Sequence, residues 1–144
     1  MWKELLTRRS PTVSFRPAAL PATVLRAQEA LRLTLPADLE ALLLETDGAE
    51  GEFGLSLVWP IERIVHDNLM FWHDGSFRDL YMPFDSMLFF SDAGNGDQFA
   101  FPLRSGRVLK TEVYAWNHEN DSRTWVAPSL EVFFEWWLSG RLTI

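Results

Sequence analysis

The chain of 144 residues contains no cysteine. This absence excludes thiol catalysis, thiolate metal sites and disulfides, and it suits a reducing compartment such as the cytoplasm, where we expect the protein to act. The chain also has no run of about 20 apolar residues, the length that crosses a bilayer as a helix. The N-terminal segment MWKELLTRRSPTVSFRP has only Leu5 and Leu6 as an apolar pair, so it has no signal-peptide core. We therefore expect no membrane association.

The length fits one domain, large enough to bury about two-thirds of the surface of the unfolded chain. Hydrophobic residues make up 47% of the sequence and charged residues 23%, as in ordinary globular proteins. Pro11, Pro17 and Pro21 follow one another closely and favour a meandering arm. The sequence therefore predicts an N-terminal arm over residues 1–20 and a folded domain over residues 21–144.

Positive charge is scarce beyond the first quarter of the chain, and the formal net charge is −7. Residues 1–32 carry six basic and two acidic side chains, whereas the remainder carries seven basic and eighteen acidic ones. An acidic body repels nucleic-acid phosphate and attracts cationic surfaces over about a Debye length, ~8–10 Å. We therefore expect no nucleic-acid partner. An acidic surface can attract a cationic protein or can serve solubility alone.

Four segments have the apolar spacing of helices. The first covers residues 22–35, and the third begins at Pro60 and covers roughly residues 60–70. The second runs from Pro36 to Thr46, with proline and acidic side chains in its first turn and Gly48 as the turn residue that ends it. The last covers residues 128–140, where Pro and Ser open the helix and Gly closes it.

Most of the expected strands follow one another without an intervening helix. They are the stretches EFGLSLVW (52–59), MLFF (87–90), QFAFPL (98–103), RVLKTEVYAW (107–116, one broken strand or two) and TWVA (124–127). Strands clustered in this way imply antiparallel pairing. The sequence therefore predicts an α+β fold in a single domain, with an antiparallel-rich central sheet packed by helices.

The connection SDAGNGDQF allows three interpretations: a phosphate site, a calcium site, or a tight turn. A nucleotide fingerprint needs a third glycine where Phe99 stands, and a P-loop needs a lysine. An EF-hand needs oxygen ligands where Gly94 and Gly96 stand. Asn95-Gly96 instead indicates a hairpin turn with positive backbone dihedral angles. We therefore expect Gly94, Asn95 and Gly96 to form a structural turn.

Three stretches taken together resemble the SUKH superfamily: LTLPADLEALLLETDGA, the hairpin GNGD, and VAPSLEVFFEWWLSG. The resemblance covers residues 21–140 and departs from the family pattern at ETDGAEGEFG, which lacks a double glycine often found there. The superfamily includes a yeast cell-wall-assembly regulator domain and bacterial immunity proteins of polymorphic toxin systems. The resemblance implies a binding protein without catalytic activity or cofactor, which neutralises a cognate, cationic toxin domain by occlusion.

Acidic residues in the expected loops are candidates for contact with such a partner, because loops leave side chains free to face it. The adjacent Trp136 and Trp137 point to different faces of the last helix, so that one of them lies nearer the surface. The candidate partner-binding residues are Glu50, Glu52, Asp92, Asp97, Glu119, Asp121 and Trp136.

Two other functions stay open. The segment NHEND could serve a hydrolase, with His118 as the base and Asp121 beside it, although a polar loop is also expected there. A regulatory scaffold protein is the other possibility, which the eukaryotic members of the superfamily imply. His66 and Glu62 have the i, i+4 spacing of metal ligands but lack a third ligand at usable spacing. We therefore expect neither a metal nor a cofactor.

Overall fold

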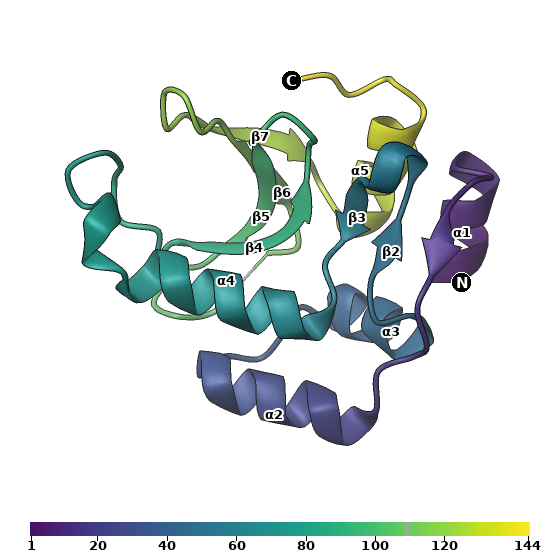
Figure 1. The fold of residues 1–144 in the computed structure, drawn as a ribbon, viewed down its shortest axis with the longest axis horizontal. Helices are drawn as coiled ribbons and strands as arrows, with labels where there is room; N and C mark the ends of the chain where they lie inside the picture. Colours follow the sequence, from purple (N-terminus) through teal and green to yellow (C-terminus); the bar gives the residue numbers. More distant parts are fainter. Residues whose placement is uncertain (109) are drawn as a thin grey trace.

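The computed structural model describes residues 1–108 and 110–144, and the strands in this part of the chain form two antiparallel sheets (Figure 1). In the smaller sheet, β2 (Ala49–Glu50) lies between β1 (Ser14–Phe15) and β3 (Ser56–Val58). In the larger sheet the spatial order follows the chain: β4 (Met87–Asp92), β5 (Gln98–Pro102), β6 (Val113–Trp116) and β7 (Arg123–Ala127). The N–H of Trp59 donates to the carbonyl of Phe90 (2.8 Å) and joins the two sheets.

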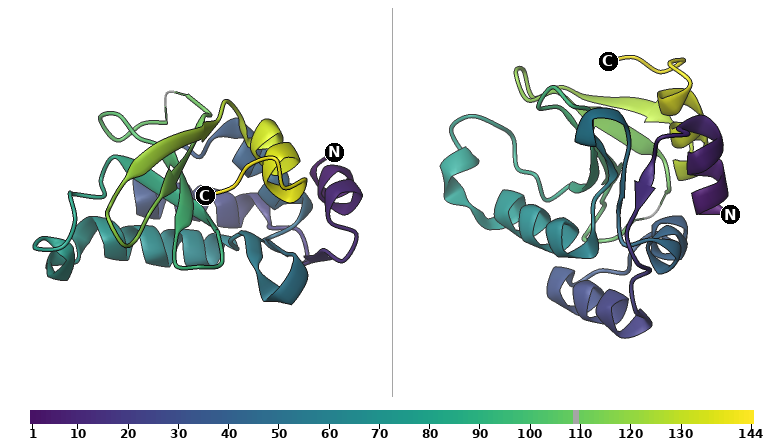
Figure 2. Two further views of the ribbon diagram at one scale, coloured as in Figure 1. Left: turned by 90° about the horizontal axis from the view of Figure 1, so that it is seen from above. Right: turned by 45° about the vertical axis from the view of Figure 1, so that its right-hand side comes forward.

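The described residues form five α-helices around these sheets. They are α1 (Trp2–Arg9), α2 (Pro21–Leu31), α3 (Ala37–Glu45), α4 (Ile61–His73) and α5 (Leu130–Leu138), with short 3-10 turns at Glu52–Gly54 and Gly75–Phe77. Figure 2 shows α1 beside α5, on the side of the molecule away from the far end of α4. This arrangement confirms the predicted single-domain α+β fold, with the strands divided between two sheets.

Strand β4 is buried on both faces, which explains why its sequence MLFF does not alternate with polar residues. On one face, Phe89 packs against Phe71 of α4, with 4.9 Å between the ring centroids. On the other face, Phe90 packs against Phe133 of α5, with 5.6 Å between the centroids. Helices α4 and α5 therefore cover opposite faces of the larger sheet, which is the central layer.

The prediction of a meandering arm over residues 1–20 is wrong for the segments that form α1 and β1. Trp2, Leu5 and Leu6 are spaced i, i+3 and i+4, and all three are buried. The carboxylate of Glu45, at the end of α3, accepts hydrogen bonds from the N-terminal amine and from the N–H groups of residues 2 and 3. The clustered prolines begin only after α1, so they do not prevent this helix.

Most other predicted elements are confirmed, with ends shifted by a few residues. The first predicted helix stops at Leu31 because Arg32 has a left-handed backbone (φ 55°), and α4 extends to His73. Of the predicted strand at 107–116, Leu109 lies outside the described residues and the part from Val113 to Trp116 forms β6. The strand predicted at 52–59 is wrong in its first half, where a 3-10 turn replaces it.

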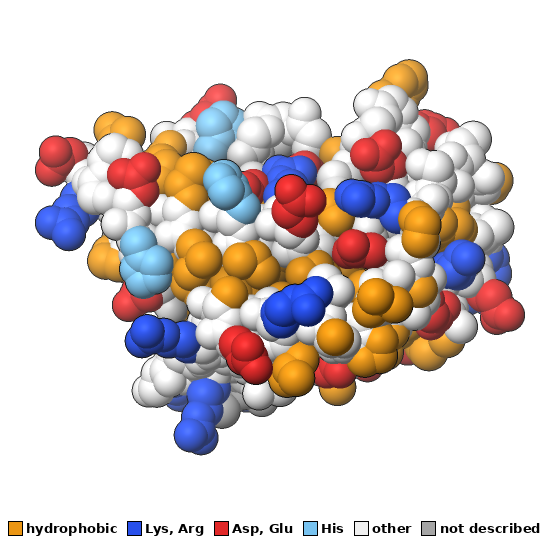
Figure 3. Space-filling model, turned by 60° about the horizontal axis from the view of Figure 1, so that its bottom comes forward, with side chains coloured by type: hydrophobic (Ala, Val, Ile, Leu, Met, Phe, Trp, Pro, Cys, Tyr) orange, Lys and Arg blue, Asp and Glu red, His pale blue; other side chains and the backbone are white. Residues whose placement is uncertain are grey.

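One face of the molecule, over α2 and α4, carries several apolar side chains (Figure 3). The exposed large hydrophobic residues of this part of the chain are Leu20, Leu25 and Met70. None of the described helices has both the length and the apolar character needed to cross a bilayer.

Candidate binding site

Three connections meet at one end of the larger sheet: residues 51–55, 93–97 and 117–122. A Cβ atom added to Gly94 would lie 3.3 Å from a side-chain carbon of Leu55, so the first two connections touch. A Cβ atom on Gly96 would lie 2.8 Å from Cε1 of His118, so the second touches the third. Carboxylates that are far apart in the sequence are thereby brought to one end of the molecule.

The connection 93–97 is the predicted hairpin turn, since β4 and β5 pair in antiparallel register on either side of it. Positive φ angles occur at Gly94 (97°) and Gly96 (99°), whereas Asn95 is not among the residues with positive φ. The side chain of Asn95 contributes differently, because its Oδ1 accepts the N–H of Asp97 (3.0 Å). Both glycines are therefore required by backbone conformation, and the asparagine closes the turn with its side chain.

Asp97 joins the hairpin to the connection 117–122. Its Oδ1 accepts the backbone N–H of His118 (3.1 Å) and lies 2.6 Å from Nδ1 of the same residue, and Asp97 is only 5% exposed. Burial raises the pKa of Asp97, but the hydrogen bonds from His118 and Asn95 outweigh it, so the pKa is lower than usual. Asp97 is one of the candidates for partner contact, and within the protein its carboxylate holds two loops together.

Asp121 fixes the same end of the sheet in a second way. Its carboxylate accepts hydrogen bonds from Trp116 Nε1 (2.8 Å), the N–H of Met82 (2.9 Å) and Arg123 Nη2 (3.1 Å). Burial raises the pKa of Asp121, but these bonds and the Arg123 charge outweigh it and lower the pKa below its usual value. The hydrolase hypothesis paired Asp121 with His118, whereas the His118 ring pairs with Asp97.

We expect Asp121→Asn to reduce stability at neutral pH, because asparagine cannot provide the charge that Arg123 meets. A carboxylate whose pKa is lowered by folding stabilises the fold above its unfolded pKa, and this contribution disappears as pH falls through the lower folded value. The stability difference between wild type and variant should therefore be constant from pH 7 to about 4 and shrink below that. Urea unfolding at several pH values measures it. Glu119→Gln, at an exposed carboxylate, is the control, and a difference that persists at low pH would contradict the assignment.

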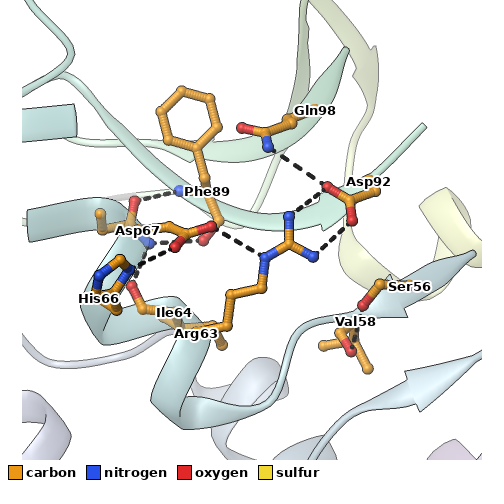
Figure 4. Close-up of polar contacts among 10 residues, drawn as sticks. Ser56, Val58, Arg63, Ile64, His66, Asp67, Phe89, Asp92 and Gln98 are labelled. Atoms are coloured by element: carbon orange, nitrogen blue, oxygen red, sulfur yellow. Dashed lines mark hydrogen bonds and ion pairs between the residues drawn. The ribbon is translucent and has the colours of Figure 1, made fainter. Parts of the chain in front are cut away.

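The carboxylate of Asp92 also has an internal partner, Arg63, as Figure 4 shows. Its oxygens accept hydrogen bonds from both terminal nitrogens of Arg63, at 2.7 and 2.9 Å, and Arg63 Nε donates to Asp67 (3.0 Å). The guanidinium also lies over the ring of Trp59, 4.0 Å from its centroid. Burial lowers the pKa of Arg63, but the two carboxylates outweigh it and raise the pKa. This bidentate pair fixes α4 to the end of β4.

Three candidate carboxylates differ from these. Glu50, Glu52 and Glu119 are exposed, and within the described chain their carboxylates make no hydrogen bond or ion pair. The structure thus divides the acidic candidates into two sets. Asp92, Asp97 and Asp121 make internal contacts with α4, His118 and Arg123. The three glutamates have no such contact within the described residues.

An open pocket of about 630 Å³ lies between the connection 51–55 and the hairpin. Its lining includes Glu52, Phe53, Arg63, Asp92, Asp97 and Gln98. Phe53 is fully exposed and has a left-handed backbone (φ 59°). The strand predicted at 52–59 would place Phe53, Leu55 and Leu57 on one half-buried face, because they alternate along the sequence. The glycines on either side of EF (GEFG) are a turn signal that contradicts this prediction.

Trp136 lies on α5 and does not line this pocket. It is half-buried, with the Arg141 guanidinium 5.0 Å from the centroid of its ring, and Trp137 is half-buried against Phe99. The most exposed tryptophan is Trp125 on β7 (45%), which donates from Nε1 to Glu112 (3.2 Å). No local pattern distinguishes Trp125 in the sequence, because its exposure depends on which sheet face α5 covers.

Comparison with known proteins agrees with this fold. A search of curated proteins gives no match. The family model described as SUKH_6, SMI1-KNR4 cell-wall, matches residues 23–134, which is well over half of the chain. The matched region begins within α2 and ends within α5, so it includes both sheets except β1, and it contains all three loops of the site. The resemblance seen in the sequence is therefore confirmed, and the chain belongs to the SUKH superfamily, in its SMI1-KNR4 cell-wall family.

Proposed function

We propose that this protein acts without catalysis, by binding a cationic protein in the cytoplasm, as an immunity protein does when it occludes the site of a cognate bacterial toxin. One observation carries the proposal: the carboxylates of Glu50 on β2, Glu52 and Glu119 have no partner within the described residues. The segments beside them are held in place, the connection 51–55 by its own backbone hydrogen bonds and the connection 117–122 by Asp97. A set of carboxylates on a fixed frame suits recognition, because the loops need little ordering when the partner binds.

Charge supports the same proposal. The net charge of −7 and the concentration of acidic residues after Arg32 favour the approach of a cationic surface. Charge complementarity of this kind raises association rates and suppresses binding to other acidic proteins. Membership of the SUKH superfamily is compatible with an immunity role and with a regulatory one. The free carboxylates favour binding of a protein partner in either case.

The test is to search beside this gene for one that encodes a cationic toxin domain and to measure the association rate of the two proteins. The variant combines Glu50→Lys, Glu52→Lys and Glu119→Lys, and we expect its association rate at low salt to fall about tenfold. Raising the salt concentration should slow the wild type toward the variant, because exposed charges are screened. Stability should change by only about 0.5 kcal/mol at each of these surface sites.

The matched control changes the net charge equally at other exposed carboxylates: Glu29→Lys, Asp79→Lys and Asp85→Lys. This control should slow association much less than the Glu50/Glu52/Glu119 lysine variant does. If both variants slow association equally, net charge and not this site directs binding. Equal rates for the wild type at low and high salt would reject electrostatic docking altogether.

A further inference from the structure

Phe53 is an unusual exposed residue. Its side chain is fully exposed, and its φ of 59° lies in the left-handed region that bulky side chains rarely adopt. The turn around it is closed by two backbone hydrogen bonds, from Gly51 N–H to the Leu55 carbonyl (2.8 Å) and from Leu55 N–H to the Glu52 carbonyl (3.1 Å). The ring is therefore held in solvent by a closed turn, against both its hydrophobicity and its backbone preference.

The pocket beside Phe53 is acidic. Glu52 has no partner within the described residues, and Asp92 and Asp97 also line the pocket. The one cationic side chain among the lining residues is Arg63, which already pairs with Asp92 and Asp67. His118 is not among the lining residues, and its ring contacts Asp97. A cation entering the pocket would thus meet an excess of carboxylates and one exposed aromatic face.

We propose that this pocket receives an arginine side chain of the protein partner, with the guanidinium stacked on Phe53 and paired with Glu52. The inference rests on the proposed function and adds to it the type of side chain and its place. Arginine fits better than lysine, because a planar and weakly hydrated guanidinium stacks on an aromatic ring while it donates to a carboxylate. The protein already makes this arrangement internally, where Arg63 stacks on Trp59 and pairs with Asp92.

The test uses the ¹⁵N-labelled protein and three blocked peptides, Ac-Gly-X-Gly-NH₂, in which X is arginine, lysine or citrulline. Citrulline has almost the shape of arginine without its charge. We expect the arginine peptide to shift the amide signals of residues 52–54 and of Gly94 and Gly96 in a saturable way. The lysine peptide should bind several-fold more weakly, and the citrulline peptide about tenfold more weakly or not at all.

Substitutions locate the binding. The substitutions Phe53→Ala and Glu52→Gln should each reduce the affinity for the arginine peptide about fivefold or more. Trp125→Ala is the matched control, because Trp125 is also an exposed aromatic residue beside a carboxylate, and it should leave binding unchanged. Phe53→Gly should also weaken binding while it maintains or raises the melting temperature, since glycine adopts a positive φ without strain. A loss of binding without a loss of stability is not expected from a purely structural residue.

Several results would overturn the inference. If the lysine peptide binds as tightly as the arginine peptide, the pocket attracts any positive charge. If the citrulline peptide binds as tightly, the pocket does not require a charged side chain. Unchanged binding by Phe53→Gly, or an equal loss in Trp125→Ala, would place the peptide elsewhere. The two proposals fail separately: if the Glu50/Glu52/Glu119 lysine variant slows association with the toxin domain while no arginine peptide binds, the proposed function stands and only the pocket assignment is wrong.

Discussion

Replacing Gly96 with valine is expected to reduce the free energy of unfolding by about 2–4 kcal/mol, because the variant combines backbone strain with a steric clash. Gly96 has a φ of 99°, which a β-branched residue strongly disfavours. The new Cβ would also lie 2.8–3.0 Å from three atoms of the His118 ring. That ring cannot move freely, since its Nδ1 lies 2.6 Å from the Asp97 carboxylate. Urea unfolding of the variant measures the loss.

The control Gly140→Val separates the cost of backbone strain from the cost of the steric clash. Gly140 also has a positive φ (79°), but a Cβ there would meet no atom within 4 Å. This control should therefore show backbone strain without the clash, and it should cost less than Gly96→Val. Adding His118→Ala to Gly96→Val should recover part of the difference. A Gly96→Val variant with an unchanged melting temperature would reject the hairpin geometry itself.

Asn68→Ala should be comparably destabilising, by about 2–4 kcal/mol, because it leaves buried backbone groups without partners. Asn68 on α4 is fully buried. Its Nδ2 donates to the carbonyls of Ile64 (2.7 Å) and Phe89 (2.9 Å), and its Oδ1 accepts the N–H of Phe89 (2.8 Å). Strand β4 is an edge strand of the four-stranded sheet, so its outer backbone groups have no neighbouring strand in that sheet. The side chain of Asn68 takes the place of such a strand at Phe89.

The measurement combines urea unfolding with hydrogen exchange at the Phe89 amide, which should exchange faster in the variant. Asn120→Ala is the control: Asn120 is exposed, and its side chain accepts one hydrogen bond, from the N–H of Ser122. We expect that substitution to cost about 1 kcal/mol or less. If Asn68→Ala costs no more than Asn120→Ala, the side chain of Asn68 does not stabilise the edge of β4.

Several features were predicted from the sequence because they depend on neighbours a few residues apart. Helix α5 is capped by Ser129, whose Oγ accepts the N–H of Val132 (3.2 Å), as the sequence PS before the helix predicts. The turn at Gly94 and Gly96 likewise follows from residues within one short connection. The order of such local signals was also sufficient to identify the superfamily. The strand prediction was wrong at Phe53, where two neighbouring glycines favour a 3-10 turn over the alternating pattern of a strand.

The composition and the local patterns of the sequence determined the α+β class, the hairpin and the acidic character of the protein. Only the tertiary structure decided which carboxylates are free, because their partners lie far away in the chain. Asp92 meets Arg63, 29 residues away, and Asp97 meets His118, 21 residues away, whereas Glu52 meets no such partner within the described residues. A carboxylate has the same local sequence signature whether it is paired or free. The difference arises from the packing of α4 and three loops around one end of a sheet, which brings distant charges within hydrogen-bonding distance.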